Sequence, residues 1–235
     1  MLIALGAAGC RAPKQAADLR IEPSSTDPCA IAADDLSPTS SSASRWQFVD
    51  CSGVAVGSPF VLDPATPSPL MTDAWLVRTT EGEVQLIRRE TTGARALMET
   101  QSPEDDARTQ FDPPLVAAPA SLAPGQPVSS RATMRVGWIS RKGTRERGEC
   151  DLTLLIEGSS RITTPAGTFD TVAVGQHFNA TLGATRVIHY ATAWVVPGAG
   201  AIAHRWTERI SVFGVPVREV CAGAVRLDAT GIASK

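Results

Sequence analysis

The five cysteines are the residues of this sequence with the most specific possible chemistry, because a thiol can be acylated, oxidised to a disulfide or left free. They are Cys10, Cys29, Cys51, Cys150 and Cys221. If Cys10 is modified separately, the four that remain form an even set, which predicts two disulfides. The preferred pairing joins Cys29 to Cys51 and Cys150 to Cys221, since each bridge then closes one segment without crossing the other. On the chain-entropy model such bridges contribute about 3 and 4.5 kcal/mol. Four cysteines allow three pairings, and free buried thiols are the alternative.

Cys10 follows an apolar, uncharged start at residues 1–9. Ala7-Ala8-Gly9-Cys10 resembles the bacterial lipobox, at which a signal peptide ends and the cysteine receives diacylglycerol and fatty acyl chains such as palmitate. The match departs from the usual pattern in two ways. Ala7 stands where Leu is common, and no basic residue precedes the apolar segment. A buried N-terminal strand with Cys10 as a core thiol is the alternative. In enteric bacteria an Asp after the cysteine retains a lipoprotein at the inner membrane. Arg11 here therefore favours the outer membrane, with the domain facing the periplasm.

The chain divides by composition into a leader, a linker and a domain. Residues 1–9 are interpreted as the remnant of a lipoprotein signal peptide. Residues 10–45 are rich in Ala, Pro, Ser and Asp and show little periodicity, so they are expected to form a flexible tether after the lipidated Cys10. Residues 46–230 contain all five tryptophans and are expected to form the folded domain.

Three histidines, His177, His189 and His204, fall on expected strands of the C-terminal half. Three imidazoles can hold zinc. Because they lack a compact i, i+2 pair, we interpret them as surface or hydrogen-bonded groups, and no metal site or other cofactor is predicted.

Among the expected strands, 201–212 has the residue pattern that most favours a ligand-binding face. Side chains alternate along a strand, so His204, Trp206 and Glu208 share one face with apolar neighbours. A purely structural core face rarely carries such polar groups, and a concave sheet lined in this way could hold an amphiphile. The alternative is that Glu208 pairs with His204 or with a nearby arginine.

Two other charged clusters are interpreted as solvent-exposed turns or loops. Residues 141–147 form a basic turn, where envelope phosphates or lipid headgroups could dock but a solvated hairpin tip is the simpler interpretation. The acidic run 104–106 is typical of a solvated loop. Catalytic motifs such as G-x-S-x-G and H-E-x-x-H are missing from the sequence, so no catalytic residue is predicted.

Short β-rich runs separated by turns predict an all-β fold, a curved antiparallel sheet or half-barrel meander preceded by the tether. Segments 74–80 and 84–88 flank Glu81-Gly82 as a hairpin, and 94–100 extends it. The proline-containing segment 101–128 is expected to be a long loop. The remaining expected strands are 131–140, 149–157, 160–164, 169–178, 185–196, 201–212 and 217–227.

Two turns resemble a known family. Thr164-Pro165-Ala166-Gly167-Thr168-Phe169-Asp170 is similar to the "P-A-G-T-F-D" element of the domain-of-unknown-function 3108-like (TapB-like) bacterial proteins. Pro197-Gly198-Ala199-Gly200 stands where these families have a "P-G-x-G" turn. The resemblance covers roughly residues 70–225. It implies a β-sheet domain exported to the cell envelope and brings no catalytic residue.

The net charge of −2 argues against nucleic-acid binding. The predicted function is therefore that of a membrane-anchored envelope lipoprotein, with a non-catalytic domain that binds or carries an amphiphile or a partner protein. A structural or assembly lipoprotein is the first alternative, and a hydrolase is the second.

Overall fold

The structure, a computed structural model, describes residues 19–36 and 43–228. It contains one short helix, α1 (Ala33–Leu36), and sixteen strands in the described residues. The strands are β1 (Arg20–Pro23), β2 (Ile31–Ala32), β3 (Ser44–Val49), β4 (Ala55–Leu62), β5 (Thr66–Pro67), β6 (Ala74–Arg78), β7 (Val84–Arg89), β8 (Arg95–Ser102), β9 (Ala107–Ala118), β10 (Ser121–Leu122), β11 (Val128–Trp138), β12 (Thr144–Thr164), β13 (Gly167–Leu182), β14 (Thr185–Val196), β15 (Gly200–Val212) and β16 (Val215–Arg226).

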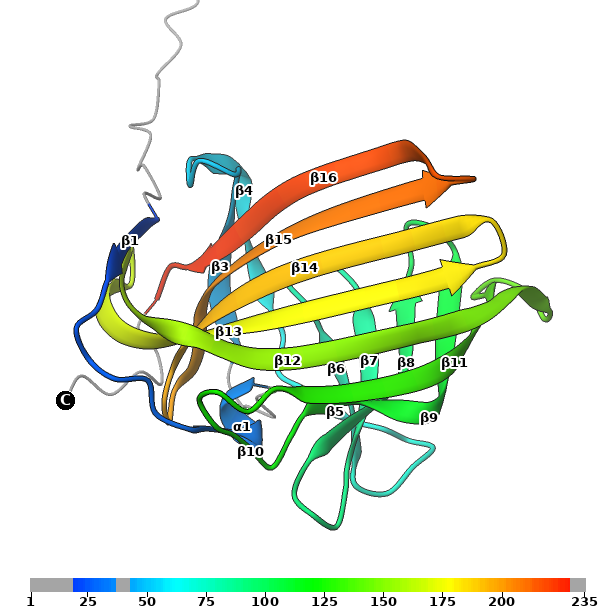
Figure 1. Ribbon diagram of the computed structural model, residues 1–235, viewed down its shortest axis with the longest axis horizontal. Coiled ribbons are helices and arrows are strands. Elements are labelled where there is room, and N and C mark those ends of the chain that lie inside the picture. Colours follow the sequence, from blue (N-terminus) through cyan, green and yellow to red (C-terminus); the bar gives the residue numbers. More distant parts are fainter. Residues whose placement is uncertain (1–18, 37–42, 229–235) are drawn as a thin grey trace, which may run out of the picture.

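One large antiparallel sheet dominates the molecule. Its strand order is β4-β3-β16-β15-β14-β13-β12-β11-β9-β8-β7-β6-β5, with β1 added beside β12. The sheet folds over itself, so that β12–β16 form one layer and β6–β8 lie behind them at a steep angle (Figure 1). The predicted curved antiparallel all-β fold is confirmed, and the sheet stays open between β4 and β5 in the described residues.

The predicted hairpins are confirmed from β6 onward. β6 and β7 pair antiparallel around the Thr79–Glu83 turn, and β8 extends the meander. The long loop expected over 101–128 is wrong, because it contains β9 and β10. β8 pairs with β9 on both sides of Pro113-Pro114 but not across them. Proline lacks the N–H that a ladder needs, so the strand continues while its pairing is interrupted there.

The flexible tether expected over 10–45 is wrong for its described part. β1 pairs with β12, and β2 pairs with β10. Ile31 is fully buried beside Leu122 and Leu154, which supplies apolar burial that composition alone did not reveal. Residues 1–18, including Cys10 and the expected signal peptide, lie outside the described residues. No helix within residues 19–36 or 43–228 is long and apolar enough to cross a membrane.

α1 lies between the two layers, where it contacts β9, β14 and β15. Its Asp34 forms an ion pair with Arg95 of β8, whose side chain is only 2% exposed. The Arg95 guanidinium also lies 5.5 Å from the centroid of the Trp75 ring. A buried charge is tolerated only when paired, so these contacts hold α1 against the inside of the sheet.

The expected disulfide pairing is also wrong. Cys51, in the β3–β4 turn, is bonded to Cys221 of β16, with their Cα atoms 5.8 Å apart. Cys29 is an exposed free thiol, and Cys150 is a buried one. Burial raises the pKa of the Cys150 thiol to about 11. Because β3 pairs with β16, strands distant in sequence become neighbours, which no rule about sequence spacing could foresee.

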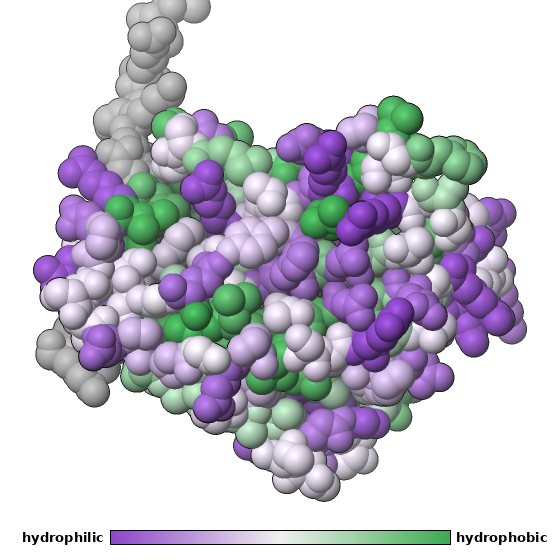
Figure 2. Space-filling view, viewed as in Figure 1, coloured by the Kyte–Doolittle hydropathy of each residue, from purple (hydrophilic) through white to green (hydrophobic). Residues whose placement is uncertain are grey.

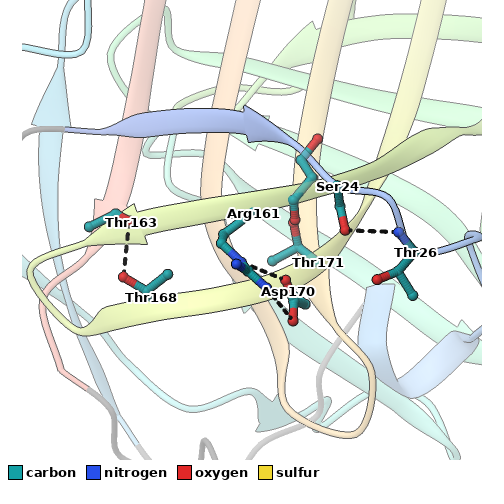
Figure 3. A network of polar contacts seen from close by, with 8 residues as sticks. Ser24, Thr26, Arg161, Thr163, Thr168, Asp170 and Thr171 are labelled. Atoms are coloured by element: carbon teal, nitrogen blue, oxygen red, sulfur yellow. Dashed lines mark hydrogen bonds and ion pairs between the residues drawn. The ribbon is translucent and has the colours of Figure 1, made fainter.

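Of the two turns that resemble the 3108-like families, Thr164–Asp170 lies in the β12–β13 hairpin and Pro197–Gly200 joins β14 to β15. Arg161 Nε donates to Asp170 Oδ1 at 2.9 Å, and the Thr163 and Thr168 hydroxyls lie 3.0 Å apart. Figure 3 shows both contacts as dashed lines. Gly167 in the turn has a φ of 137°, a backbone conformation that other residues rarely adopt. These contacts fix the register of the two long central strands.

Candidate functional site

A cavity of about 210 Å³ lies between the two layers of the sheet. Most of its wall is apolar and comes from both layers, for example Ile87 and Leu97 on one side and Leu152 and Val174 on the other. Leu36 of α1 also lines it. Only Arg78 and Glu81 among its lining residues are exposed, so the cavity opens beside the β6–β7 turn.

Polar side chains from both layers line the rest of the cavity. His189 of β14 faces Glu81, with 3.8 Å between His189 Nε2 and Glu81 Oε1. His204 of β15 lies on the neighbouring strand, where the register places it opposite Ala193. The Glu81 side chain is 26% exposed and the His189 side chain 13%. The His189 imidazole and the Glu81 carboxyl group thus meet at the opening, while His204 lines the cavity beside a position four residues along β14 from His189.

Burial keeps this polar group largely uncharged at neutral pH. Burial, followed by the nearby Glu83 and Glu208 carboxylates, raises the pKa of Glu81 to about 8. Burial lowers the pKa of His189 to about 4. Burial, with His189 as a second cause, lowers the pKa of His204 to about 4. At pH 7 the carboxyl group is therefore mostly protonated and both imidazoles are neutral.

His204 Nδ1 is buried and has no hydrogen-bond partner among the described residues. Leaving such an atom unpaired costs about 1–3 kcal/mol. Buried polar atoms in native proteins nearly always have a partner, so an exception calls for an explanation. A ligand hydroxyl group, which can both donate and accept, would supply the missing hydrogen bond.

Of the three residues expected to face a ligand, only His204 lines the cavity. Trp206 is buried behind the cavity wall in a cluster with Trp46, and its ring centroid lies 6.5 Å from that of Phe48. Glu208 instead forms an ion pair with Arg218 at 3.6 Å. The alternative expectation, that Glu208 pairs with a nearby arginine, is therefore confirmed.

The sheet register separates the three histidines. Phe178 pairs with His189, so the preceding residue, His177, points to the opposite face. His177 is exposed on the outside beside Tyr190. No group of three or more potential ligands for a metal ion is found in the described part of the chain.

Two residues of the site, Glu81 and His189, were not expected from the sequence. Glu81 stands in an E-G-E turn, which is typical of a solvated hairpin tip. His189 lies on an expected strand, but its face relative to His204 depends on the β14–β15 register. The alternating pattern places each residue on one of two faces and does not show which face encloses a cavity.

The fold and its cavity define an all-β protein whose open antiparallel sheet folds over a small, mostly apolar space. No family model matches the chain, so the resemblance to the 3108-like families stays a prediction. No curated protein matches it either.

Two solved structures are similar to it. One is a "putative lipoprotein" of Parabacteroides distasonis, 14% identical, covering 79% of this chain and 93% of its own, with a TM-score of 0.39. The other is a "putative exported protein with YmcC-like fold" of Bacteroides fragilis, 13% identical, with the same coverage and a TM-score of 0.37. These low values assign no function to this chain.

Proposed function

We propose that this protein is a lipid-anchored protein of the bacterial cell envelope, whose sheet binds a small amphiphile without catalysis. The observation that carries the proposal is the cavity, because it combines an apolar wall with the unpaired Nδ1 of His204. Ligand sites in proteins have this composition, mostly apolar with a few placed polar groups.

The size and charge of the cavity define the ligand further. A volume of about 210 Å³ equals about seven water molecules at roughly 30 Å³ each. It therefore accepts a short chain, or the end of a longer one, and not a whole lipid. Because Glu81, His189 and His204 are uncharged at pH 7, the favoured ligand has an uncharged head, such as a hydroxyl group, that hydrogen-bonds to His204.

A cavity-filling substitution tests the binding proposal. We expect 1-octanol to bind the wild-type protein saturably and the Ala193→Phe variant at least about tenfold more weakly, since the new phenyl ring occupies the space of the ligand. Isothermal titration calorimetry measures both affinities.

The matched control is Thr181→Phe, which adds the same ring at an exposed position of β13. Equal octanol affinity of wild type and Ala193→Phe, with both proteins folded by circular dichroism, would contradict the proposed site. Absence of saturable binding to the wild type would instead favour an assembly lipoprotein. The exposed Phe213, Val215 and Val217 of the β15–β16 hairpin support that second candidate.

The anchor is supported by the lipobox-like sequence before Cys10 and by the Cys51–Cys221 disulfide, since disulfides persist in oxidising compartments such as the periplasm. We expect mass spectrometry of the protein from its native membrane to show an N-terminal, acylated Cys10. The same spectra are expected to show one Cys51–Cys221 bridge. An unmodified Cys10 within an uncut chain would rule out the anchor and leave the cavity proposal standing.

A further inference from the structure

A second hollow, of about 430 Å³, lies on the outer surface beside the β11–β12 turn. It shares no lining residue with the internal cavity. Four of its lining residues are cationic: Arg108, Arg135, Arg141 and Lys142. In Figure 2 strongly hydrophilic side chains gather at the right-hand end, where Figure 1 places this turn. A protein with a formal net charge of −2 thus concentrates positive charge at one place.

Arg135 and Arg141 each have an unusual environment. Arg135 of β11 stands directly opposite Arg147 of β12, and like charges in that position destabilise a sheet. The guanidinium of Arg141 lies 3.9 Å from the centroid of the Trp138 ring, and that of Arg145 lies 4.1 Å from it. Stacking on an aromatic ring restricts a guanidinium while leaving its N–H groups free to donate.

Nearby acidic groups neutralise only part of this charge. Arg108 forms an ion pair with Glu99 at 2.6 Å. The Asp106 carboxylate accepts hydrogen bonds from the Ser140 amide and hydroxyl, and these, with the charge of Arg141, lower its pKa. No ion pair with a carboxylate is found for Arg135, Arg141 or Lys142 within residues 19–36 and 43–228.

The backbone beside the hollow is irregular. The β11–β12 pairing shifts register between Val136 and Gly137, and such bulges redirect the side chains next to them. Gly137 lets the basic turn pack closely on β11, because an added Cβ would lie 2.9 Å from the Gly143 carbonyl oxygen. The bulge and the glycine therefore set the position of the turn that carries Arg141 and Lys142.

We propose that this hollow binds a phosphate-bearing anion through Arg135, Arg141 and Lys142, with Trp138 orienting the guanidinium of Arg141. Guanidinium groups match the geometry of phosphate oxygens, and several converging cations favour an anion of this charge. The phosphate can come from a soluble phosphate ester or from the headgroup of an anionic phospholipid. The site is independent of the internal cavity and of its proposed ligand.

The test compares two doubly substituted proteins that lose the same charge. We expect inorganic phosphate and glycerol 3-phosphate to bind the wild type in calorimetry at low salt. We expect Arg135→Gln/Arg141→Gln to bind both at least about tenfold more weakly. The control, Arg131→Gln/Arg161→Gln, removes two exposed, carboxylate-paired arginines outside the hollow and is expected to bind as the wild type does. Equal affinities of the two double variants would overturn the proposal.

Vesicles distinguish the two sources of phosphate. If a lipid headgroup is the ligand, the wild type sediments with phosphatidylglycerol-containing vesicles and not with phosphatidylcholine vesicles, and Arg135→Gln/Arg141→Gln loses this binding. Calorimetric binding without vesicle binding identifies a soluble ester. Failure to bind both the soluble phosphates and the phosphatidylglycerol vesicles would overturn the site.

A single substitution separates binding from folding. Arg147→Glu places an opposite charge across from Arg135, so it is expected to raise the melting temperature while it weakens phosphate binding. A variant that is more stable and binds less cannot have lost binding through unfolding. Unchanged phosphate affinity in this variant would count against the role of Arg135.

Discussion

Replacing Cys51 and Cys221 by serine is expected to lower the free energy of unfolding by about 3–5 kcal/mol, because the bridge closes a very long loop in the unfolded chain. The two cysteines are 170 residues apart in sequence. The bridge also secures β3, which pairs with β16 over only four residues, Gly223 to Arg226. For a chain of this size the loss corresponds to a fall in melting temperature of about 6–20 °C. Urea unfolding followed by tryptophan fluorescence measures it.

The exposed free thiol supplies the control. Cys29→Ser removes a cysteine that has no disulfide partner within residues 19–36 and 43–228, and it is expected to leave the unfolding free energy within about 0.5 kcal/mol of the wild type. Adding a reducing agent to the wild type is expected to reproduce the double variant, while Cys29→Ser responds to the agent as the wild type does. An unfolding curve of the double variant that coincides with the wild-type curve would refute the structural role of this bridge.

Glu81 is expected to make the protein less stable as the pH rises from about 4.5 to about 8. Its pKa is about 8 in the folded protein against an ordinary 4.5, so the unfolded state loses this proton first. Over that interval the unfolded state binds fewer protons, and stability therefore falls with rising pH. Glu81→Gln removes this loss and is expected to raise the free energy of unfolding at pH 8 by about 2–3 kcal/mol, since a pKa unit corresponds to 1.36 kcal/mol and the site is partly solvated. Thermal unfolding from pH 5 to 9 measures the difference.

Glu83, His189 and His204 change the stability over other pH ranges, which distinguishes their effects from that of Glu81. Burial, then the charges of Glu208 and Asp105, raises the pKa of Glu83 to about 6, so Glu83→Gln is expected to produce a smaller effect that ends at lower pH. His189 and His204 act at the acidic side: the unfolded state takes up protons at pH 6.5 and the folded state near 4, so stability falls as pH drops through that window. If Glu81→Gln followed the wild-type pH profile, Glu81 would not be a buried acid at the cavity opening.

Ionisation of Glu81 also links stability to the proposed binding. Above pH 8 the carboxylate places a negative charge at the opening, beside an apolar wall that cannot solvate it. Octanol binding is therefore expected to change with pH in the wild type and to lose this dependence in Glu81→Gln.

Local patterns were sufficient to predict the fold class and most of the C-terminal strands. The alternation and turn residues around Gly82, Gly167 and Gly198 correspond to hairpins of the observed sheet. Local physics decides such hairpins, because the turn residues and the two-residue period act within a few positions. The same rules failed at Pro113-Pro114, where burial of Phe111 and Leu115 keeps the chain in a strand despite the missing donors.

Only the tertiary structure decided which distant residues meet. The pairing of β3 with β16 brings Cys51 to Cys221, and the folding of the sheet over itself brings Glu81 to His189. The segment 19–36 has the composition of a tether, yet Ile31 and Asp34 find partners inside the sheet. The sequence by itself determined the alternation, the turns and the lipobox-like start. Strand register and contacts between distant strands decide which face is enclosed, which cysteines pair and which acid is buried. Their free energies arise only in the assembled sheet, so no local stretch of sequence contains them.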